Sequence, residues 1–220
     1  MISDDFDSLA AFDNGNWNHN SAYHHYLLRR LPPRCQTSLE VGCGAGAFAR
    51  LVAQRSEKVL ALDLSPRMIS LAKERSVGYQ NIEYIAADGL SFPLPLASYD
   101  CVASISTLHH LDLAAALTRL AALVSPGGVL LALDLYRAAS VTDYLISALA
   151  LPVNLSLRVW HGDVRPKPEL VRKAWSAHRC HERILTFAQV SRICASVLPG
   201  ARLRRHLLWH YSIVWTRENE

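Results

Sequence analysis

Three acidic residues and a glycine-rich loop are spaced in a way that suits a small cationic ligand. The loop, residues 42–46 of LEVGCGAGAF, follows an apolar run and precedes a helical pattern. Its glycines let the backbone approach a ligand closely and present the amides of a helix N-terminus to it. Glu40 stands before the loop, Asp63 follows the next apolar run, and Asp88 follows the third. Carboxylates at these places predict acceptors around a ligand that carries positive charge.

The loop by itself also fits a dinucleotide-binding fingerprint. Gly42, Gly44 and Ala47 satisfy G-x-G-x-x-G/A, and Asp63 lies about 20 residues further on, where an acid binds a ribose. The carboxylate of Glu40 argues against that ligand, because it would repel a pyrophosphate at the loop. S-adenosylmethionine instead brings a sulfonium, an ammonium, a diol and an exocyclic amine, so each acid gains a partner.

The elements that position these residues read as alternating strands and helices. The runs that indicate buried strands are SLEV, KVLALD, IEYIA, YDCVASI and VLLALD, in that order. Ser65 with Pro66 predicts a helix start after the second run, and Asp112 predicts another after the fourth. The SPGG segment, residues 125–128, is expected to end that helix before the fifth strand.

Both ends of the chain add elements to this sheet. Residues 17–31 are predicted to form one N-terminal helix, and Thr186 with Gln189 has the capping-box spacing that opens a last helix. Two strands with a turn at residues 208–209 follow. The predicted fold is α/β: a Rossmann-like, doubly wound seven-stranded sheet with five parallel strands, then a terminal hairpin with one antiparallel strand.

We expect one domain over residues 1–220, with an N-terminal helical cap at 1–34 and an inserted lid at 137–184. The lid prediction starts from residues 144–157, an apolar run interrupted by polar residues and by Pro152. Such breaks favour several short helices over one long helix. These helices are expected to cover a substrate and to order when ligands bind.

In this order, the motifs resemble those of the class I S-adenosylmethionine-dependent methyltransferases, over residues 35–134. The resemblance is to the small-molecule branch that includes ubiquinone and menaquinone biosynthesis enzymes. LEVGCGAG is similar to the family's glycine motif, VLALDLSPRMISLAKER to its second-strand acid and helix, and IEYIAADGLSFPL to its third-strand acid. YDCVASISTLHHL and LVSPGGVLLALD are similar to its fourth and fifth strand motifs. The resemblance implies an enzyme that uses S-adenosylmethionine as its cofactor.

Carried over by position, the resemblance also implies a cofactor site. Asp63 would accept from both ribose hydroxyls, Asp88 from the adenine amine, and Glu40 would orient the loop or the amino group. The other cofactor-binding residues it implies are Gly42, Gly44 and Gly46 along the methionine portion, Leu64 and Met68 beside the adenine, Gly89 next to Asp88, and the backbone of Ser104 and Ile105. Met68 would equally suit ordinary helix packing.

Histidines after the fourth strand are candidates for the chemistry. His109, next to His110, could remove a proton from a hydroxyl or amine during methyl transfer, and we take it as the candidate catalytic residue. A packed or helix-capping histidine is the alternative. Tyr23 shares part of a helical face with His19 and could close over the cofactor, as N-terminal aromatic helices often do in related enzymes. A surface or packing role is its alternative.

The cysteine and histidine patterns indicate neither a metal site nor a disulfide framework. Five cysteines without a C-x-x-C pair suit a reducing compartment, and the H-x-C-H motif at His178 lacks a carboxylate to complete a zinc site. The acidic start MISDDFD does not resemble a secretory signal, and the longest apolar run is too short to span a bilayer. We therefore expect a cytoplasmic protein without a bound metal.

The composition is mildly basic, with a formal net charge of +4 and a pI near 8.9, which permits an anionic partner. Nucleic-acid methylation is a rival function, but SISTLHH stands where exocyclic-amine nucleic-acid methyltransferases resemble one another in an N/D-P-P-aromatic motif. A protein or peptide acceptor stays open, as does a protein that binds S-adenosylmethionine without transferring its methyl group. We expect a small hydrophobic acceptor from secondary metabolism, methylated on O in preference to N or C. The sequence leaves a homodimer open.

Overall fold

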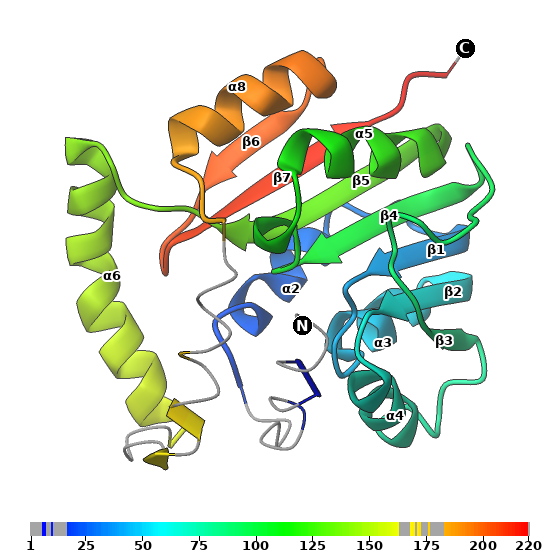
Figure 1. Ribbon diagram of the computed structural model, residues 1–220, viewed down its shortest axis with the longest axis horizontal. Coiled ribbons are helices and arrows are strands. Elements are labelled where there is room, and N and C mark those ends of the chain that lie inside the picture. Colours follow the sequence, from blue (N-terminus) through cyan, green and yellow to red (C-terminus); the bar gives the residue numbers. More distant parts are fainter. Residues whose placement is uncertain are drawn as a thin grey trace.

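The chain alternates strands and helices, and Figure 1 shows how they assemble in the computed structural model. The structure describes residues 6–7, 10, 17–162, 168–169, 171–172, 176 and 183–219. Its strands are β1 (Cys35–Val41), β2 (Ser56–Asp63), β3 (Ile82–Ala86), β4 (Tyr99–Ile105), β5 (Val124–Leu135), β6 (Arg202–Arg205) and β7 (His210–Thr216). Its helices are α2 (Ser21–Leu28), α3 (Ala47–Ala53), α4 (Pro66–Glu74), the 3₁₀ turn η1 (Leu108–His110), α5 (Leu113–Leu123), α6 (Val141–Trp160) and α8 (Phe187–Val197).

The strands form one sheet in the order β3-β2-β1-β4-β5-β7-β6. Strands β1 to β5 pair in parallel, and β7 pairs antiparallel with both β5 and β6. The predicted seven-stranded, doubly wound sheet is therefore confirmed, including its antiparallel strand. After β3 the chain returns to place β4 beside β1, so the strand order reverses there. A sheet of this kind binds ligands beyond the carboxyl ends of its strands at such a reversal.

Helices cover both faces of the sheet, and each face has its own apolar core. On one face α5 and α8 pack through buried side chains that include Leu117 and Val190. On the other face α2, α3 and α4 contribute Leu27, Phe48 and Ile69. The central strands are thus buried on both sides, which explains their nearly continuous apolar sequence. A sheet held from both faces gives the loops at its edge a rigid base.

Three predicted helix starts are confirmed by their capping bonds. The Ser65 side chain accepts the amide of Met68, with Pro66 as the first helical residue of α4. Asp112 accepts the amide of Ala115 at the start of α5, and Thr186 and Gln189 form a reciprocal capping box at α8. These side chains satisfy amides that a helix N-terminus would otherwise leave without partners.

Two predicted boundaries are wrong. The N-terminal helix covers Ser21–Leu28 instead of residues 17–31, because Asn18 accepts hydrogen bonds from Ser21 and holds a turn before the helix. At the other boundary, α5 ends at Leu123, and residues 125–128 already belong to β5. The pairing of β4 with β5 shifts register just after Tyr99, which accommodates the glycine pair within the strand.

The prediction of several short helices in the inserted segment is also wrong, because α6 is one continuous helix of 20 residues. Pro152 lies inside it and removes only its own backbone donor. The hydroxyls of Ser147 and Ser156 donate to carbonyls one turn back, and a capping box at Ser140 and Asp143 fixes the start. The polar residues are thus satisfied within the helix. Much of the remaining predicted lid lies outside the described residues.

Candidate functional site

The glycine loop joins β1 to α3 at the point where the strand order reverses. Gly42 and Gly46 have left-handed φ angles of 76° and 74°, which favour glycine. A Cβ at Gly42 would lie 1.9 Å from Oγ1 of Thr107, and one at Gly46 would lie 2.3 Å from the hydroxyl of Tyr84. The left-handed turn and the close approach of Tyr84 and Thr107 therefore both require glycine at these two positions.

Asp63 ends β2 directly beside this loop. Its Oδ2 accepts the amide of Gly44 at 2.7 Å, and its Oδ1 accepts the amide of Ser65 at 2.9 Å. Burial raises the pKa of Asp63, and these two amides act in the opposite direction because they favour the carboxylate. The carboxyl group therefore links the loop to the start of α4, at the position expected for a ribose.

Glu40 is the most buried of the three acids, at 2% exposure. Burial raises its pKa well above the usual value, and the charge of Asp63 raises it further. Its Oε2 has no hydrogen-bond partner among the described residues. A buried oxygen without a donor costs free energy, so a cationic or N–H-bearing ligand at the loop would stabilise this carboxylate.

Asp88 follows β3 and is exposed. Its Oδ1 accepts the amide of Leu90 at 3.0 Å, and its Oδ2 accepts the hydroxyl of Ser91 at 3.0 Å, so the side chain closes its own turn. Gly89 is buried against Val41 of β1, and a Cβ there would lie 2.4 Å from a Val41 methyl group. The turn after β3 is thereby packed directly onto the strand that leads to the glycine loop.

The other expected cofactor residues border the same strand ends. Leu64 is 44% exposed, whereas Met68 is buried at the start of α4. Ser104 is fully buried, and its hydroxyl donates to the Val41 carbonyl at 3.0 Å, which ties β4 to β1. Ile105 ends β4 beside it and is nearly buried. The structure brings the loop and the acids together; the role of each residue toward a cofactor stays a prediction.

His109 lies on η1 and forms a buried pair with Asp134, near the end of β5. Its Nδ1 is 2.5 Å from Oδ1 of Asp134, and its backbone N–H donates to Oδ2 of the same carboxylate at 3.0 Å. Asp134 is fully buried and also accepts the amide of Leu135 at 2.6 Å. The imidazole is therefore held in one orientation by a carboxylate that is itself fixed.

A polar cluster beside η1 was not predicted. Asn20 accepts the hydroxyl of Ser106 at 2.8 Å and lies 2.9 Å from Nε2 of His210. Tyr23 packs its ring against that of His210, and its hydroxyl donates to the Leu207 carbonyl. Burial raises the pKa of Tyr23 to about 12. Tyr23 is thus anchored to the β6–β7 turn, and its expected place over the cofactor stays a prediction.

The N-terminus contributes a residue that sequence reasoning also missed. Asp7 accepts hydrogen bonds from the hydroxyl of Ser65 and, at 3.3 Å, from the amide of Arg67. Its carboxylate therefore sits at the N-terminus of α4, next to the turn that follows Asp63. No sequence motif marks this contact, because residues 7 and 65 are far apart in the chain and a single aspartate carries no pattern.

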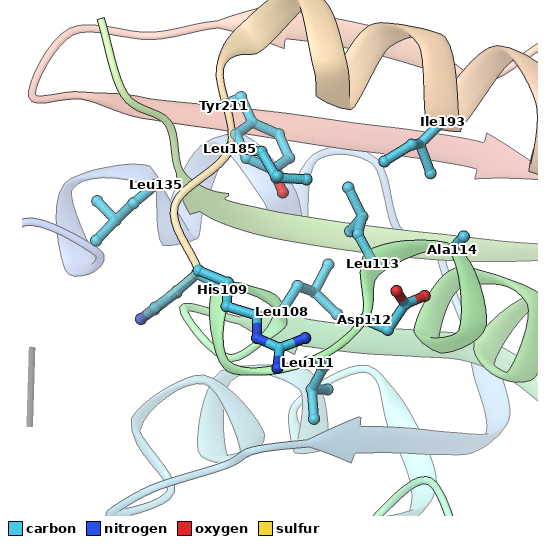
Figure 2. Close-up of a pocket in the computed structure, with 11 residues that line it drawn as sticks. Leu108, His109, Leu111, Asp112, Leu113, Ala114, Leu135, Leu185, Ile193 and Tyr211 are labelled. Atoms are coloured by element: carbon cyan, nitrogen blue, oxygen red, sulfur yellow. The ribbon is translucent and has the colours of Figure 1, made fainter. Parts of the chain in front are cut away.

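An apolar cavity of about 210 Å³ opens beside η1, and Figure 2 shows the side chains around it. Leu108 and His109 come from η1, Tyr211 from β7, and Ile193 from α8. Its complete lining is Leu108, His109, Leu111, Asp112, Leu113, Ala114, Leu135, Arg183, Leu185, Ile193 and Tyr211. The cavity can therefore hold a small apolar group against the segment that carries His109.

Among the described residues, no group of three or more histidine, cysteine, aspartate or glutamate side chains is placed to hold a metal ion. Free cysteines Cys35, Cys43, Cys101 and Cys194 are all buried. Within the same part of the chain, no helix is both long and apolar enough to cross a membrane.

Residues 39–132 match the model of a family described as a methyltransferase domain. The chain is 30% identical over 209 residues to an uncharacterized methyltransferase of Mycobacterium bovis, covering 90% of this chain and 96% of that protein. It is 39% identical over 94 residues to the malonyl-acyl-carrier-protein O-methyltransferase of Serratia marcescens, which covers 42% of this chain and 36% of that protein. Among solved structures, the N-methyltransferase NodS of Bradyrhizobium japonicum with S-adenosyl-L-homocysteine has a TM-score of 0.60 at 18% identity, covering 91% of this chain and 88% of that one.

Proposed function

Because the chain belongs to the S-adenosylmethionine-dependent methyltransferases, we propose that it transfers the methyl group of this cofactor to an oxygen of a small, hydrophobic acceptor. The observation that carries the proposal is the His109–Asp134 pair: His109 lines an apolar cavity, and Thr107, two residues earlier, donates to the Gly42 carbonyl of the glycine loop at 3.4 Å. It gives one site a cofactor-binding edge, a group able to accept a proton, and room for an apolar substrate.

The residues at the glycine loop fit S-adenosylmethionine. The buried Glu40 oxygen without a hydrogen-bond donor suits the ammonium group or the cationic end of the cofactor. Asp63 lies beside the loop with a carboxylate that can accept from a diol. Asp88, exposed at the neighbouring turn, can accept from an exocyclic amine. When bound, the cofactor supplies a methyl group on a positively charged sulfur, which is already an activated donor.

The His109–Asp134 pair is suited to take a proton from an acceptor hydroxyl. With its Nδ1–H donating to Asp134, the imidazole carries its lone pair on Nε2, where a proton can be accepted. Asp134 then stabilises the imidazolium that forms. We assign His109 as the catalytic base and Asp134 as the residue that positions it.

The acceptor is proposed to place an apolar part in the cavity beside η1. Leucine, isoleucine and tyrosine side chains dominate its lining, which favours an apolar group over a sugar or nucleotide. Oxygen is preferred as the methylated atom because a hydroxyl carries a proton that a neutral histidine base can accept as the methyl group is transferred. The similarity to an O-methyltransferase over part of the chain agrees with this choice.

Helix α6 is proposed to border the entrance for this acceptor, within the lid expected at 137–184. Its inner side reaches the N-terminal cap, because Asn154 Oδ1 lies 2.8 Å from His19 Nε2. The Ser147 hydroxyl accepts from the indole N–H of Trp209 at 3.2 Å. These contacts join α6 to the N-terminal cap and to the β6–β7 turn.

Two measurements test the proposal. Titration calorimetry should detect binding of S-adenosylmethionine and S-adenosylhomocysteine, with no comparable binding of NAD. Incubation with the labelled cofactor and a panel of apolar hydroxy and carboxylic acids should then produce S-adenosylhomocysteine and a labelled ether or ester. Label on RNA or on protein in place of the small acceptors, or cofactor binding without any transfer, would contradict the proposed acceptor class.

A further inference from the structure

Helix α6 turns its polar side toward the protein and its apolar side away from it. The residues facing the body are Asp143, Ser147, Ala150 and Asn154, spaced by four, three and four positions, so they share one side of the helix. Asp143 is buried and pairs with Arg205 at 3.4 Å. On the same side, Ser147 accepts from the Trp209 indole and Asn154 contacts His19. Amphipathic helices on globular proteins ordinarily have the opposite arrangement.

The outward side of α6 is mostly apolar, with Thr142 and Ser156 as its exposed polar residues. Nine of the thirteen large hydrophobic side chains that are exposed among the described residues lie on this helix: Val141, Tyr144, Leu145, Leu149, Leu151, Val153, Leu155, Val159 and Trp160. None of the residues of α6 classed as exposed carries a charge. Figure 1 shows the helix at one side of the molecule, standing clear of the layered body. A contiguous apolar surface of this kind marks an interaction site.

The sequence that follows α6 is basic, which is complementary to an anionic surface. Arg158 is the charged residue nearest the end of the helix, and residues 162–183 contain six lysines or arginines against three acids. Clustered basic residues beside an apolar helix are attracted to anionic lipid headgroups.

The aromatic residues of the helix also suit a lipid interface. Tyr144 is 63% exposed near the start of α6, and Trp160 is 85% exposed at its end. Such rings favour the boundary between headgroups and acyl chains. The helix is about 30 Å long and, as noted, not apolar enough to span a membrane. Its anchored polar side would keep it lying along the surface.

We propose that the outward face of α6 docks this protein on the surface of an anionic lipid bilayer. The helix would lie in the plane of the interface, with Leu145, Leu149 and Leu155 inserted below the headgroups. The proposal rests on the inverted polarity of the helix together with the basic composition of the sequence that follows it, residues 162–183. It does not depend on the identity of the methyl acceptor.

The test is cosedimentation of the full chain with vesicles. Vesicles of phosphatidylcholine with an equal share of phosphatidylglycerol should bind the protein more tightly than vesicles of phosphatidylcholine alone. The triple variant Leu145→Gln/Leu149→Gln/Leu155→Gln should lower the partition constant by about tenfold or more, because each leucine loses its apolar transfer. The matched control Val77→Gln/Leu96→Gln changes exposed apolar residues away from α6 and should bind like the wild type.

A second measurement does not depend on the triple variant folding. Tryptophan emission of the wild type should shift to shorter wavelength on addition of the anionic vesicles, and Trp160→Phe should remove most of that shift. Absence of vesicle binding by the wild type would overturn the proposal, as would equal binding by the triple and control variants. Sedimentation velocity that shows a dimer dissociated by the triple variant would instead assign this face to a second copy of the chain.

Discussion

The side-chain Nδ1 of His109 lies 2.5 Å from Oδ1 of Asp134, and the backbone N–H of His109 donates to Oδ2 of the same carboxylate. One aspartate therefore fixes both the ring and the backbone of the turn after β4. Asp134 comes from the next strand of the sheet, β5, so the parallel pairing of β4 and β5 sets the geometry. The pair is buried, with exposures of 8% for His109 and 0% for Asp134.

If His109 acts as a general base, its replacement should slow turnover without weakening cofactor binding. His109→Gln is expected to lower kcat by about 10²- to 10⁴-fold, with the affinity for S-adenosylmethionine nearly unchanged. The exposed His25 on α2 offers a control, and His25→Gln should leave kcat intact. Full turnover by His109→Gln would leave proximity and orientation as the source of catalysis.

Asp134→Asn tests the positioning role separately. The amide can no longer stabilise an imidazolium, so kcat should fall while KM for the acceptor changes little. Loss of the negative charge disfavours the imidazolium, so the rise of kcat with pH should move to lower pH in the variant, which a merely structural aspartate would not cause. A loss of activity that follows only a loss of thermal stability would contradict this assignment.

Asp63 and Asp88 should differ in their importance for cofactor binding. Asp63→Ala removes a carboxylate placed for two charge-assisted hydrogen bonds, each contributing about 1.5–3 kcal/mol, so affinity should drop by at least tenfold. Asp88→Asn keeps an oxygen that can accept from an amine, so its effect should be smaller. Calorimetric titration ranks the two. A neutral Asp63→Ala together with a damaging Asp88→Asn would mean that the roles are exchanged.

The contact between Gly89 and Val41 predicts a coupled pair. Gly89→Ala should destabilise the protein by about 1–3 kcal/mol, because its Cβ would overlap a Val41 methyl group. Val41→Ala removes that methyl group, so the double variant should be more stable than the sum of the single effects predicts. The coupling should amount to about 0.5–3 kcal/mol in a double-mutant cycle measured by urea unfolding. Strict additivity would show that the turn after β3 relaxes freely.

Much of the fold could be predicted because its signals are local. Strand runs, capping residues such as Ser65 and Asp112, and the glycine turn are each specified by a few neighbouring residues, and the structure has them where expected. The apolar run of α6 was predicted to form several short helices, because Pro152 and the serines disfavour a continuous helix locally. The capping box at Ser140 and the buried Asp143 outweigh that tendency.

The site residues that belong to a sequence motif could be predicted. Those brought together only by the tertiary fold could not. Glu40, Asp63 and the glycine loop follow from sequence spacing. Asp134 could be placed at the substrate end of the fifth strand, but its pairing with His109 could not be predicted, because the pairing requires β5 to lie next to β4. The contact of Asp7 with Ser65 at the start of α4 likewise joins residues that are far apart in the sequence. Chain-distant hydrogen bonds leave no periodic pattern in a single sequence.

His24 predicts how stability depends on pH. It is buried on α2 against Phe48, and burial lowers its pKa from 6.5 to about 4, with the charge of His25 adding to the effect. The unfolded chain therefore takes up a proton between pH 6.5 and 4 that the folded protein does not. The free energy of unfolding should fall as pH drops through this window, by up to about 1.4 kcal/mol per pH unit for this one group. His206 and His210, whose pKa values are also lowered to about 4, steepen the fall.

The variant His24→Leu tests this dependence, because it keeps an apolar side chain against Phe48 and removes one titrating group. Urea unfolding at pH 7.5 and at pH 5 should show a smaller loss of unfolding free energy for the variant than for the wild type. An unchanged loss between the two pH values would mean that His24 titrates equally in the folded and unfolded states.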